Sequence, residues 1–411
     1  MTYKIKLKQG SDFRVAVTLL MLSSVMPARA ETPLSLSVSE TLTYDSNILR
    51  DNQRKRRDVV SSTGVQIGFD KSYGRQTYTA TAAAQVQRYK NSKEYDNDGY
   101  DISLGFSTEI GKDGSLQIQH DRSQSLQDFG DQGRVRDKIV IDSNSTTVSG
   151  RYGLYGRWSL TGSFDQNDVA YTEPYDYQNK SSRGVRVGLR YNPSDLLYFD
   201  GGLKRTVSDY PKYPLFSGLT EGDRVKRLDL DLRSGWTVTG FSNLTAQVSW
   251  TQEKHETLDA RFVDDDRRDF NGLTGRLNWN FSPAGKTSYA VALDRDTNNA
   301  GGSSGLFSSY AQNRLTTGLV LNATWRPTAK ISVVGGFNVR WFEEEQRDLD
   351  GAAPTQSLKG NYQSLSLKLN YSPTRNLGFT CSLMAYDRTE TVFANAYSGE
   401  TASCSASFSI D

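Results

Sequence analysis

The sequence has little of what a soluble enzyme normally depends on. Its 411 residues include only two histidines and two cysteines, and hydrophobic residues make up 36% of the chain. A water-soluble chain of this length normally carries a larger apolar share for its core. After the N-terminal stretch no window approaches 18 apolar residues, so a membrane helix is excluded and any membrane crossing must be made by strands. The net charge of +2 is close to balance, which argues against a nucleic-acid partner.

The first thirty residues have the pattern of a secretory leader. Lys4, Lys6 and Lys8 form a basic start, residues 15 to 26 form an apolar run, and residues 28 to 30 read Ala-Arg-Ala. This order of a basic region, an apolar region and an Ala-x-Ala site is typical of a cleaved signal peptide. We therefore expect a signal peptide at 1–30 and a mature chain at 31–411.

The mature chain is dominated by alternation of apolar and polar residues. Leu228, Leu230 and Leu232, for example, are interleaved with Asp229 and Asp231. Successive strand side chains point to opposite faces, so such a segment offers one face to hydrocarbon and one to water. Eighteen segments of this kind occur, at about 34–44, 62–70, 76–89, 100–110, 114–122, 145–154, 156–166, 183–192, 196–206, 225–238, 243–253, 270–281, 287–297, 314–326, 330–343, 360–372, 376–388 and 398–410. The sequence predicts an all-β fold, a single transmembrane antiparallel β-barrel of about 18 strands.

The connections between these segments alternate in length. Even-numbered segments are followed by tight turns, at 71–75, 111–114, 192–195, 282–286, 326–330 and 372–376. Odd-numbered segments are followed by long polar stretches, the longest at 123–144. Barrels have short periplasmic turns and longer external loops, so both chain ends are expected on the periplasmic side. Four turns begin with an aromatic residue two positions before proline, which predicts an aromatic girdle of Tyr191, Phe281, Trp325 and Tyr371.

The polar parity of the strands predicts which residues line the lumen. The set mixes amides with charges of both signs, as a hydrated channel needs, and it resembles the lining of a sugar-conducting pore. A general water-filled lumen without preference is equally compatible with this composition. The candidate sugar contacts are Gln85, Gln87, Gln117, Gln119, Arg157, Asp165, Arg186, Arg190, Asp200, Lys204, Asp229, Asp231, Arg233, Arg276, Asn278, Asn322, Asn338, Arg340 and Lys368.

Two further groups carry candidate chemistry. Cys381 and Cys404 have the apolar parity of the last two segments, at similar distances from the hairpin tip. A cross-strand disulfide and two unpaired lipid-facing thiols are both compatible with that placement. In the first long loop, the basic run Arg54, Lys55, Arg56 and Arg57 could bind lipopolysaccharide phosphates or an acidic polymer, or could simply be solvated.

Signals for catalysis and metal binding are weak. Residues 301–305 match a G-x-S-x-G string but lie in a loop rich in glycine and serine. The string at 120–123, His-Asp-Arg-Ser, could suggest a barrel-surface hydrolase, yet an outward histidine at the membrane interface explains it as well. Acidic stretches at 94–101 and 264–266 lack the calcium-loop pattern. We expect no enzyme, no cofactor and no bound metal.

The opening of the mature chain carries a family resemblance. Residues 44 to 50 read Tyr-Asp-Ser-Asn-Ile-Leu-Arg after an alternating segment. This opening resembles that of the outer-membrane β-barrel proteins of exopolysaccharide biosynthesis operons, and the aromatic-x-Pro turns fit the same family. The resemblance implies a porin-like channel in the outer membrane of a Gram-negative bacterium that exports an extracellular polysaccharide together with a periplasmic polysaccharide export protein. The alternatives are a general or sugar-selective diffusion porin for small solutes and, less favoured, a barrel-embedded surface hydrolase. Outer-membrane lipids and lipopolysaccharide are the expected surroundings.

Overall fold

The computed structural model describes most of the mature chain. It covers residues 33–130, 136–216, 219–257, 269–283, 285–297, 311–347, 356–390 and 395–410, and Pro33–Asp411 form one compact unit. The expected signal peptide lies outside the described residues. Among these residues, no helix is long and apolar enough to cross a membrane.

Eighteen strands follow one another along this unit. The first nine are β1 (Leu34–Asp45), β2 (Asp58–Tyr73), β3 (Gln76–Tyr89), β4 (Asn97–Ile110), β5 (Gly114–Leu126), β6 (Val140–Tyr152), β7 (Trp158–Tyr171), β8 (Lys180–Ser194) and β9 (Leu197–Phe216). The second nine are β10 (Leu219–Thr239), β11 (Ser242–Thr257), β12 (Phe270–Phe281), β13 (Thr287–Thr297), β14 (Ala311–Thr328), β15 (Ile331–Arg347), β16 (Gln356–Tyr371), β17 (Leu377–Arg388) and β18 (Tyr397–Ile410). Two short 3-10 helices, η1 (Lys93–Tyr95) and η2 (Asp176–Gln178), lie in external loops.

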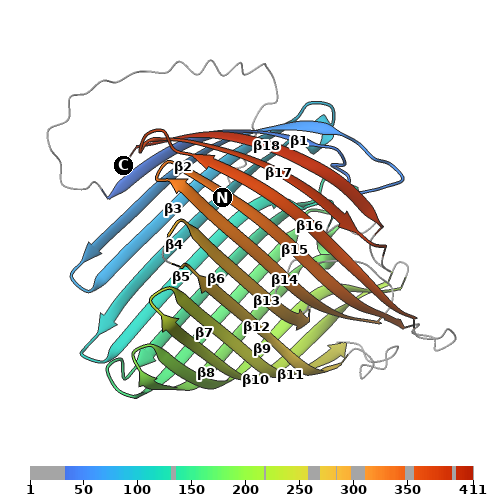
Figure 1. Cartoon of the computed structure of the whole chain (residues 1–411). Coiled ribbons are helices and arrows are strands. Elements are labelled where there is room, and N and C mark those ends of the chain that lie inside the picture. The colour runs from blue at the N-terminus through green and yellow to red at the C-terminus, as the bar shows by residue number, and fades with distance from the viewer. Residues whose placement is uncertain are drawn as a thin grey trace, which may run out of the picture. The chain divides into compact units, whose positions relative to one another are not determined.

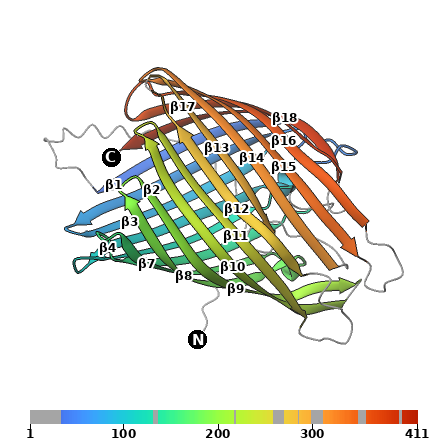
Figure 2. The same cartoon turned by 60° about the horizontal axis from the view of Figure 1, so that its bottom comes forward.

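The strands form one closed antiparallel sheet. Each strand pairs with its neighbours in the chain, and β1 pairs with β18 from Leu36↔Ile410 to Asp45↔Thr401. Figures 1 and 2 show the blue β1 lying beside the red β18, where the sheet closes. Closure leaves no unpaired edge, which a sheet in hydrocarbon requires because no water is there to satisfy backbone groups. The predicted all-β barrel of about 18 strands is confirmed.

The outer face of the barrel is apolar and the inner face is polar. Leu228, Leu230 and Leu232 on β10 are 40%, 64% and 55% exposed, as are many large apolar side chains of the other strands. Such exposed apolar side chains are expected on the outer face of a membrane barrel, where they contact lipid. At the periplasmic end, Tyr191 packs on Trp158 with ring centroids 4.6 Å apart, and Phe281 and Tyr371 make similar contacts with β13 and β17.

Several predicted loops are shorter than expected because the strands continue past the apolar belt. The expected connection between 206 and 225 is largely strand, since β9 and β10 stay paired out to Leu219↔Phe216, with register shifts near the prolines. Likewise, the expected loop at 123–144 contracts to 127–139, because Leu126 pairs with Val140. Polarity marks where a strand leaves the lipid, and it does not mark where its hydrogen-bond ladder ends.

Small apolar clusters are confined to the external loops. Ile48, Leu49, Tyr95 and Phe129 form one such cluster. A second contains Ile139, Tyr171 and Tyr175. These clusters fix the loops at the external end of the barrel.

Candidate functional site: the polar lumen and its external mouth

The strands place nearly all of the predicted lumen residues on the inner face. The face is identified by the alternation with exposed apolar neighbours on every strand and by the register between strands. Arg157 is the exception, because it lies in the turn before β7 and not in a strand. Candidate contacts on the inner face are Gln85, Gln87, Gln117, Gln119, Asp165, Arg186, Arg190, Asp200, Lys204, Asp229, Asp231, Arg233, Arg276, Asn278, Asn322, Asn338, Arg340 and Lys368.

The wall from β7 to β13 holds a network of paired charges. Arg186 of β8 donates to Asp231 of β10 at 2.7 Å and to Asp200 of β9 at 2.6 Å. Arg190 and Arg233 approach the same two carboxylates at 3.3 and 3.0 Å. Arg186 and both carboxylates are at most 3% exposed. Because charges withdrawn from water need well-oriented partners, the network is held tightly in one arrangement.

A second network lies nearer the external end. Arg227 donates to Asp229 at 2.9 Å, to Glu253 at 3.1 Å and to Asp296 at 2.8 Å. Thr251 donates to Asp229 at 2.6 Å, and Glu253 is 1% exposed. Three carboxylates thus accept hydrogen bonds from the single guanidinium of Arg227.

Glycines let these charged side chains lie flat on the wall. A Cβ at Gly202 would come within 2.5 Å of the Arg186 Nη2, and one at Gly188 within 2.6 Å of its Nη1. Asp165 lies in the same way over Gly184, whose Cβ would meet a carboxylate oxygen at 2.5 Å. The guanidinium of Arg186 thus occupies space where other residues would project a side chain.

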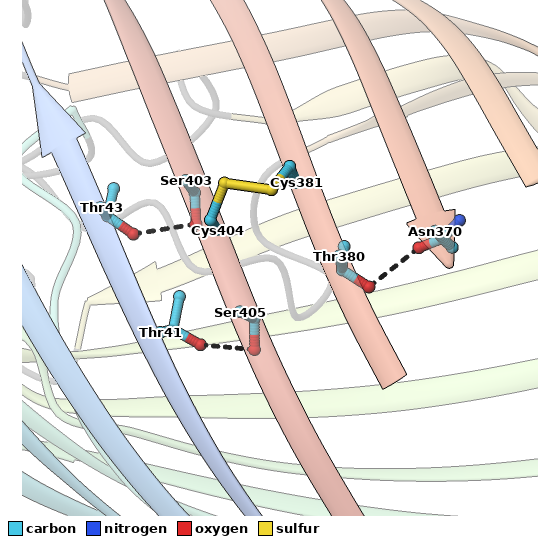
Figure 3. The surroundings of a disulfide bond; sticks show 8 residues. All are labelled: Thr41, Thr43, Asn370, Thr380, Cys381, Ser403, Cys404 and Ser405. Carbon is cyan, nitrogen blue, oxygen red and sulfur yellow. Dashed lines mark hydrogen bonds between the residues drawn. A yellow bond between two sulfur atoms is a disulfide. The ribbon is translucent and has the colours of Figure 1, made fainter. Parts of the chain in front are cut away.

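The wall around the closure of the sheet has a different chemistry, because short hydroxyl and amide side chains predominate there. The hydrogen bonds drawn in Figure 3 are Thr41 to Ser405 at 2.9 Å, Thr43 to Ser403 at 3.1 Å and Thr380 to Asn370 at 3.0 Å. Gln85 donates to Ser62, and Gln119 to Ser103, farther along the same wall. The lumen thus has an ionic wall and a largely neutral, hydroxyl-rich wall.

The string at the opening of the mature chain forms a hydrogen-bonded cluster around Arg50 at the external end of β1. Arg50 donates to Asp45 at 2.7 Å, and its guanidinium lies 4.3 Å from the ring centroid of Tyr386 on β17. Tyr386 donates to Asp45 at 3.1 Å, and Asn47 is fully buried. Arg50 has a φ of 53°, a backbone conformation that needs such support in a residue with a side chain.

The external loop after β5 reaches inward across this cluster. The Phe129 ring packs on Tyr95 at 4.7 Å, and the Gly130 carbonyl accepts from the inward-facing Arg388 of β17 at 3.0 Å. The loop starts at β5, which lies six strands from β17 in the order β17–β18–β1–β2–β3–β4–β5. Six spacings of about 4.8 Å give an arc of about 29 Å along the wall. The loop therefore occupies part of the external mouth.

The basic run lies on the external surface beside this cluster. Arg54, Lys55 and Arg57 are exposed, and Arg56 is half-buried and pairs with Glu94 of η1 at 2.6 Å. The Arg56 pair ties the first loop to the second. Three of the four cations remain largely open to solvent.

Electrostatics also hold the first and third external loops together. Burial opposes ionisation of Asp51, but the backbone N–H of Gln53 and the positive charges of Arg136 and Arg54 lower the pKa of this carboxyl below its ordinary value. Arg136 in turn donates to the Arg50 carbonyl at 2.9 Å. Burial lowers the pKa of the Arg136 guanidinium.

Cys381 and Cys404 form a disulfide between β17 and β18. They are register partners with Cα atoms 4.1 Å apart, and Cys404 is also opposite Leu42 of β1. Cys404 lies between the inward-facing Ser403 and Ser405 on β18, and Cys381 follows the inward-facing Thr380 on β17 (Figure 3). The disulfide therefore faces the lipid and not the lumen.

Glu40 is a residue of interest that the sequence reasoning missed. It lies between Val38 and Leu42 on the outward face of β1 and is exposed. Ser61 donates to one of its carboxylate oxygens at 2.6 Å and Thr63 to the other at 2.5 Å. The sequence could have revealed it, because Glu40 occupies an even position of β1 and the other even positions of this strand are apolar or aromatic.

The string at 120–123 is split between the two faces of β5. His120 faces outward, where its Nδ1 lies 2.9 Å from the Thr146 hydroxyl. Asp121 faces the lumen and accepts from Ser103 at 2.6 Å. Strand alternation thus separates the residues that a hydrolase would need side by side.

The acidic stretch at 94–101 is used in pairing. Glu94 and Asp98 bind Arg56 and Arg88, and Asp96 accepts from the Tyr89 backbone. Within the described ranges, no group of three or more His, Cys, Asp or Glu side chains is placed where it could hold a metal ion. The stretches at 264–266 and 301–305 lie outside the described residues.

The fold and the site together define a class of protein. A closed barrel with an apolar outer belt, an aromatic girdle and a polar lumen is a transmembrane β-barrel. Eighteen strands enclose a lumen wide enough for water. The chain is a channel-like barrel of the outer membrane of a Gram-negative bacterium.

Comparisons with known proteins give likeness only in overall structure. No family model matches the chain, and no curated protein matches it. Among solved structures it is similar to OpdK of Pseudomonas aeruginosa, described as an outer membrane protein, with 11% identity, 92% of this chain and 98% of that chain covered, and a TM-score of 0.45. OpdQ of the same organism has 11% identity, the same coverage and a TM-score of 0.44. The siderophore receptor PirA of Pseudomonas aeruginosa has 10% identity, coverage of 93% and 81%, and a TM-score of 0.43.

Proposed function

We propose that the barrel is a passive, non-catalytic channel for small polar solutes, uncharged sugars included. The observation that carries the proposal is the division of the lumen into a paired ionic wall and a hydroxyl-rich wall. Hydroxyl groups such as those of Thr43 and Ser403 can exchange hydrogen bonds with a sugar in place of water. The ionic wall offers few open charges, because its guanidinium groups are already engaged by carboxylates.

The external mouth supports small solutes over a polymer. A secreted chain needs a continuous wide exit, whereas the loop from β5 takes up part of the mouth as far as Arg388. Only a solute small enough to pass beside this loop would reach the lumen without a rearrangement.

The test is solute flux into liposomes that contain the purified barrel. Neutral sugars of increasing size should enter up to a cut-off. Replacing Thr43 by Val and Ser403 by Ala should slow sugar entry while leaving potassium chloride conductance unchanged, because the variants keep the bore and lose hydroxyls. Asn278→Ala, which alters an inner-face amide of the opposite wall, is the matched control. Equal sugar flux in both variants would contradict a role for the hydroxyl-rich wall.

Polysaccharide export is the second candidate, and it is favoured by the opening string of the mature chain. Asp45, Asn47 and Arg50 of that string form the hydrogen-bonded cluster at the external mouth. In this reading a periplasmic polysaccharide export protein would deliver the polymer, and the loop from β5 would swing away on engagement. Deletion of the gene separates the two candidates. Loss of extracellular polysaccharide with normal sugar uptake would establish export, and slowed sugar uptake with normal polysaccharide would establish the diffusion channel.

A further inference from the structure

A polar groove lies on the outside of the barrel, on the external side of the apolar belt. One row of register partners crosses it, from Asn144 on β6 through Asp168 on β7 and Ser181 on β8 to Asp209 on β9. All four side chains have outward parity. Amide, hydroxyl and carboxylate groups thus form one band outside the wall, perpendicular to the strands.

Two arginines lie just below this groove. Arg183 is the first outward-facing residue below Ser181 on β8, and Arg205 is the second outward-facing residue below Asp209 on β9. Arg183 pairs with Val207 and Arg205 with Val185, so the two are diagonal neighbours, about 7–8 Å apart. Both side chains are exposed, and within the described part of the chain neither has an ion-pair or hydrogen-bond partner.

The apolar belt begins directly beneath Arg183 and at the level of Arg205, whose register partner is Val185. Val185 and Val187 on β8 are 53% and 56% exposed, and Leu203 on β9 is 51% exposed. Leu228 and Leu230 continue this surface on β10. From the external end towards the membrane centre, the wall therefore presents hydrogen-bonding groups, then two unpaired cations at the upper edge of the apolar belt, and then hydrocarbon-compatible side chains.

We propose that this surface is a binding site for a phosphorylated glycolipid of the outer leaflet, of the lipid A type found in lipopolysaccharide. Such a molecule has acyl chains, phosphates and sugars in the same vertical order as the three tiers of the wall. Arginine binds phosphate oxygens through two parallel hydrogen bonds, and two arginines at this spacing can hold one phosphate between them. The acyl chains lie on the valines and leucines below, and the sugar hydroxyls meet the groove above.

The groove favours sugar over a second phosphate. Asp209 is already paired with Arg224 at 2.6 Å, whereas among the described residues Asp168 accepts hydrogen bonds only from the neutral Ser181 and Gln166. A carboxylate that keeps its negative charge repels phosphate and accepts hydrogen bonds from hydroxyl groups. The site is independent of what passes through the lumen.

The test uses the purified, delipidated barrel in detergent and three probes: diphosphoryl lipid A, the same lipid without its phosphates, and inorganic phosphate. Binding is followed by native mass spectrometry and by titration of a fluorescent lipid A. The test variant is Arg183→Gln/Arg205→Gln. Arg295→Gln is the control, because Arg295 is another outward arginine near the external end, with its Nη2 3.9 Å from Glu343. Heat-modifiable migration verifies that each variant is folded.

The double variant should bind diphosphoryl lipid A roughly 25-fold more weakly, because each arginine contributes about fivefold at an anionic lipid surface. The control should bind as the wild type does, and the dephosphorylated lipid should bind the wild type as weakly as the double variant binds lipid A. Equal binding of lipid A by the wild type and the folded double variant would overturn the proposal. Full displacement of lipid A by inorganic phosphate would also overturn it, since the site would then be a simple anion site.

Discussion

Removing the disulfide should destabilise the barrel by an amount that follows from its position in the chain. Cys381 and Cys404 are separated by 23 residues, and they close a loop that contains the last hairpin. The chain-entropy relation for a loop of this size gives a loss of about 11 cal/mol/K on cross-linking the unfolded chain, or about 3 kcal/mol at 25 °C. The variant Cys381→Ala/Cys404→Ala should therefore unfold about 3 kcal/mol more easily than the wild type.

The assay is reversible urea unfolding in lipid vesicles, followed by tryptophan fluorescence and by heat-modifiable migration. Each single cysteine-to-alanine variant should be as unstable as the double variant, because either change breaks the same cross-link. A hydrophilic phosphine reductant should leave the disulfide of the embedded barrel intact and cleave it in urea, since the bond faces hydrocarbon. A double variant within about 0.5 kcal/mol of the wild type would refute the entropic argument. Cleavage as fast in the embedded barrel as in the unfolded chain would refute the outward placement.

Three further outcomes test the register, the lipid-facing carboxylate and the mouth. Leu367→Arg should impair assembly, because a cation facing hydrocarbon near the midplane costs about 2–4 kcal/mol, whereas Ser366→Arg on the inner face should assemble normally; the reverse result in a folding gel would show the register to be wrong. Glu40→Gln should raise the urea midpoint in vesicles by removing a charge while keeping an acceptor for the two hydroxyls, and an unchanged or lower midpoint would show that the charge is not costly where it lies. The lowered pKa of Asp51 adds stability that is complete above the ordinary carboxyl value and is lost as the pH falls through the lower, folded value. Amides of residues 47–56 should therefore lose hydrogen-exchange protection on strong acidification in the wild type, and an equal loss in Asp51→Asn would contradict this cause.

The alternation of residues was enough to predict the strand count and the inner face. Asp229, Asp231 and Arg233 were placed in the lumen because the leucines between them had to face lipid, and the structure has them there. Strand ends were less predictable. Residues 208–216 contain two prolines and lack the alternation of the belt, yet they continue β9, because pairing with β10 satisfies the backbone whether or not lipid surrounds it.

Partners within the lumen could not be read from the sequence. Arg186 meets Asp231 only because β8, β9 and β10 are staggered as they are, and alternation carries no information about stagger. Arg50 meets Tyr386 at a separation of 336 residues through closure of the sheet. The outward position of Glu40 in β1 could be read from the alternation. One carboxylate in an otherwise regular strand did not change the pattern that predicted the fold, so it was overlooked.

The glycines beneath the charged side chains set the width of the lumen, so substitution of these glycines would change it. Arg186 can lie against the wall because Gly188 and Gly202 provide no Cβ atoms beneath it. A single methyl group at either position would lift a cation towards the permeating stream, narrowing the passage and making it more selective against positive solutes. Sequence change at such sites can therefore alter what the barrel admits without touching any residue that a solute contacts, and related barrels with equal strand number and equal lumen charge can differ in permeability through glycine content alone.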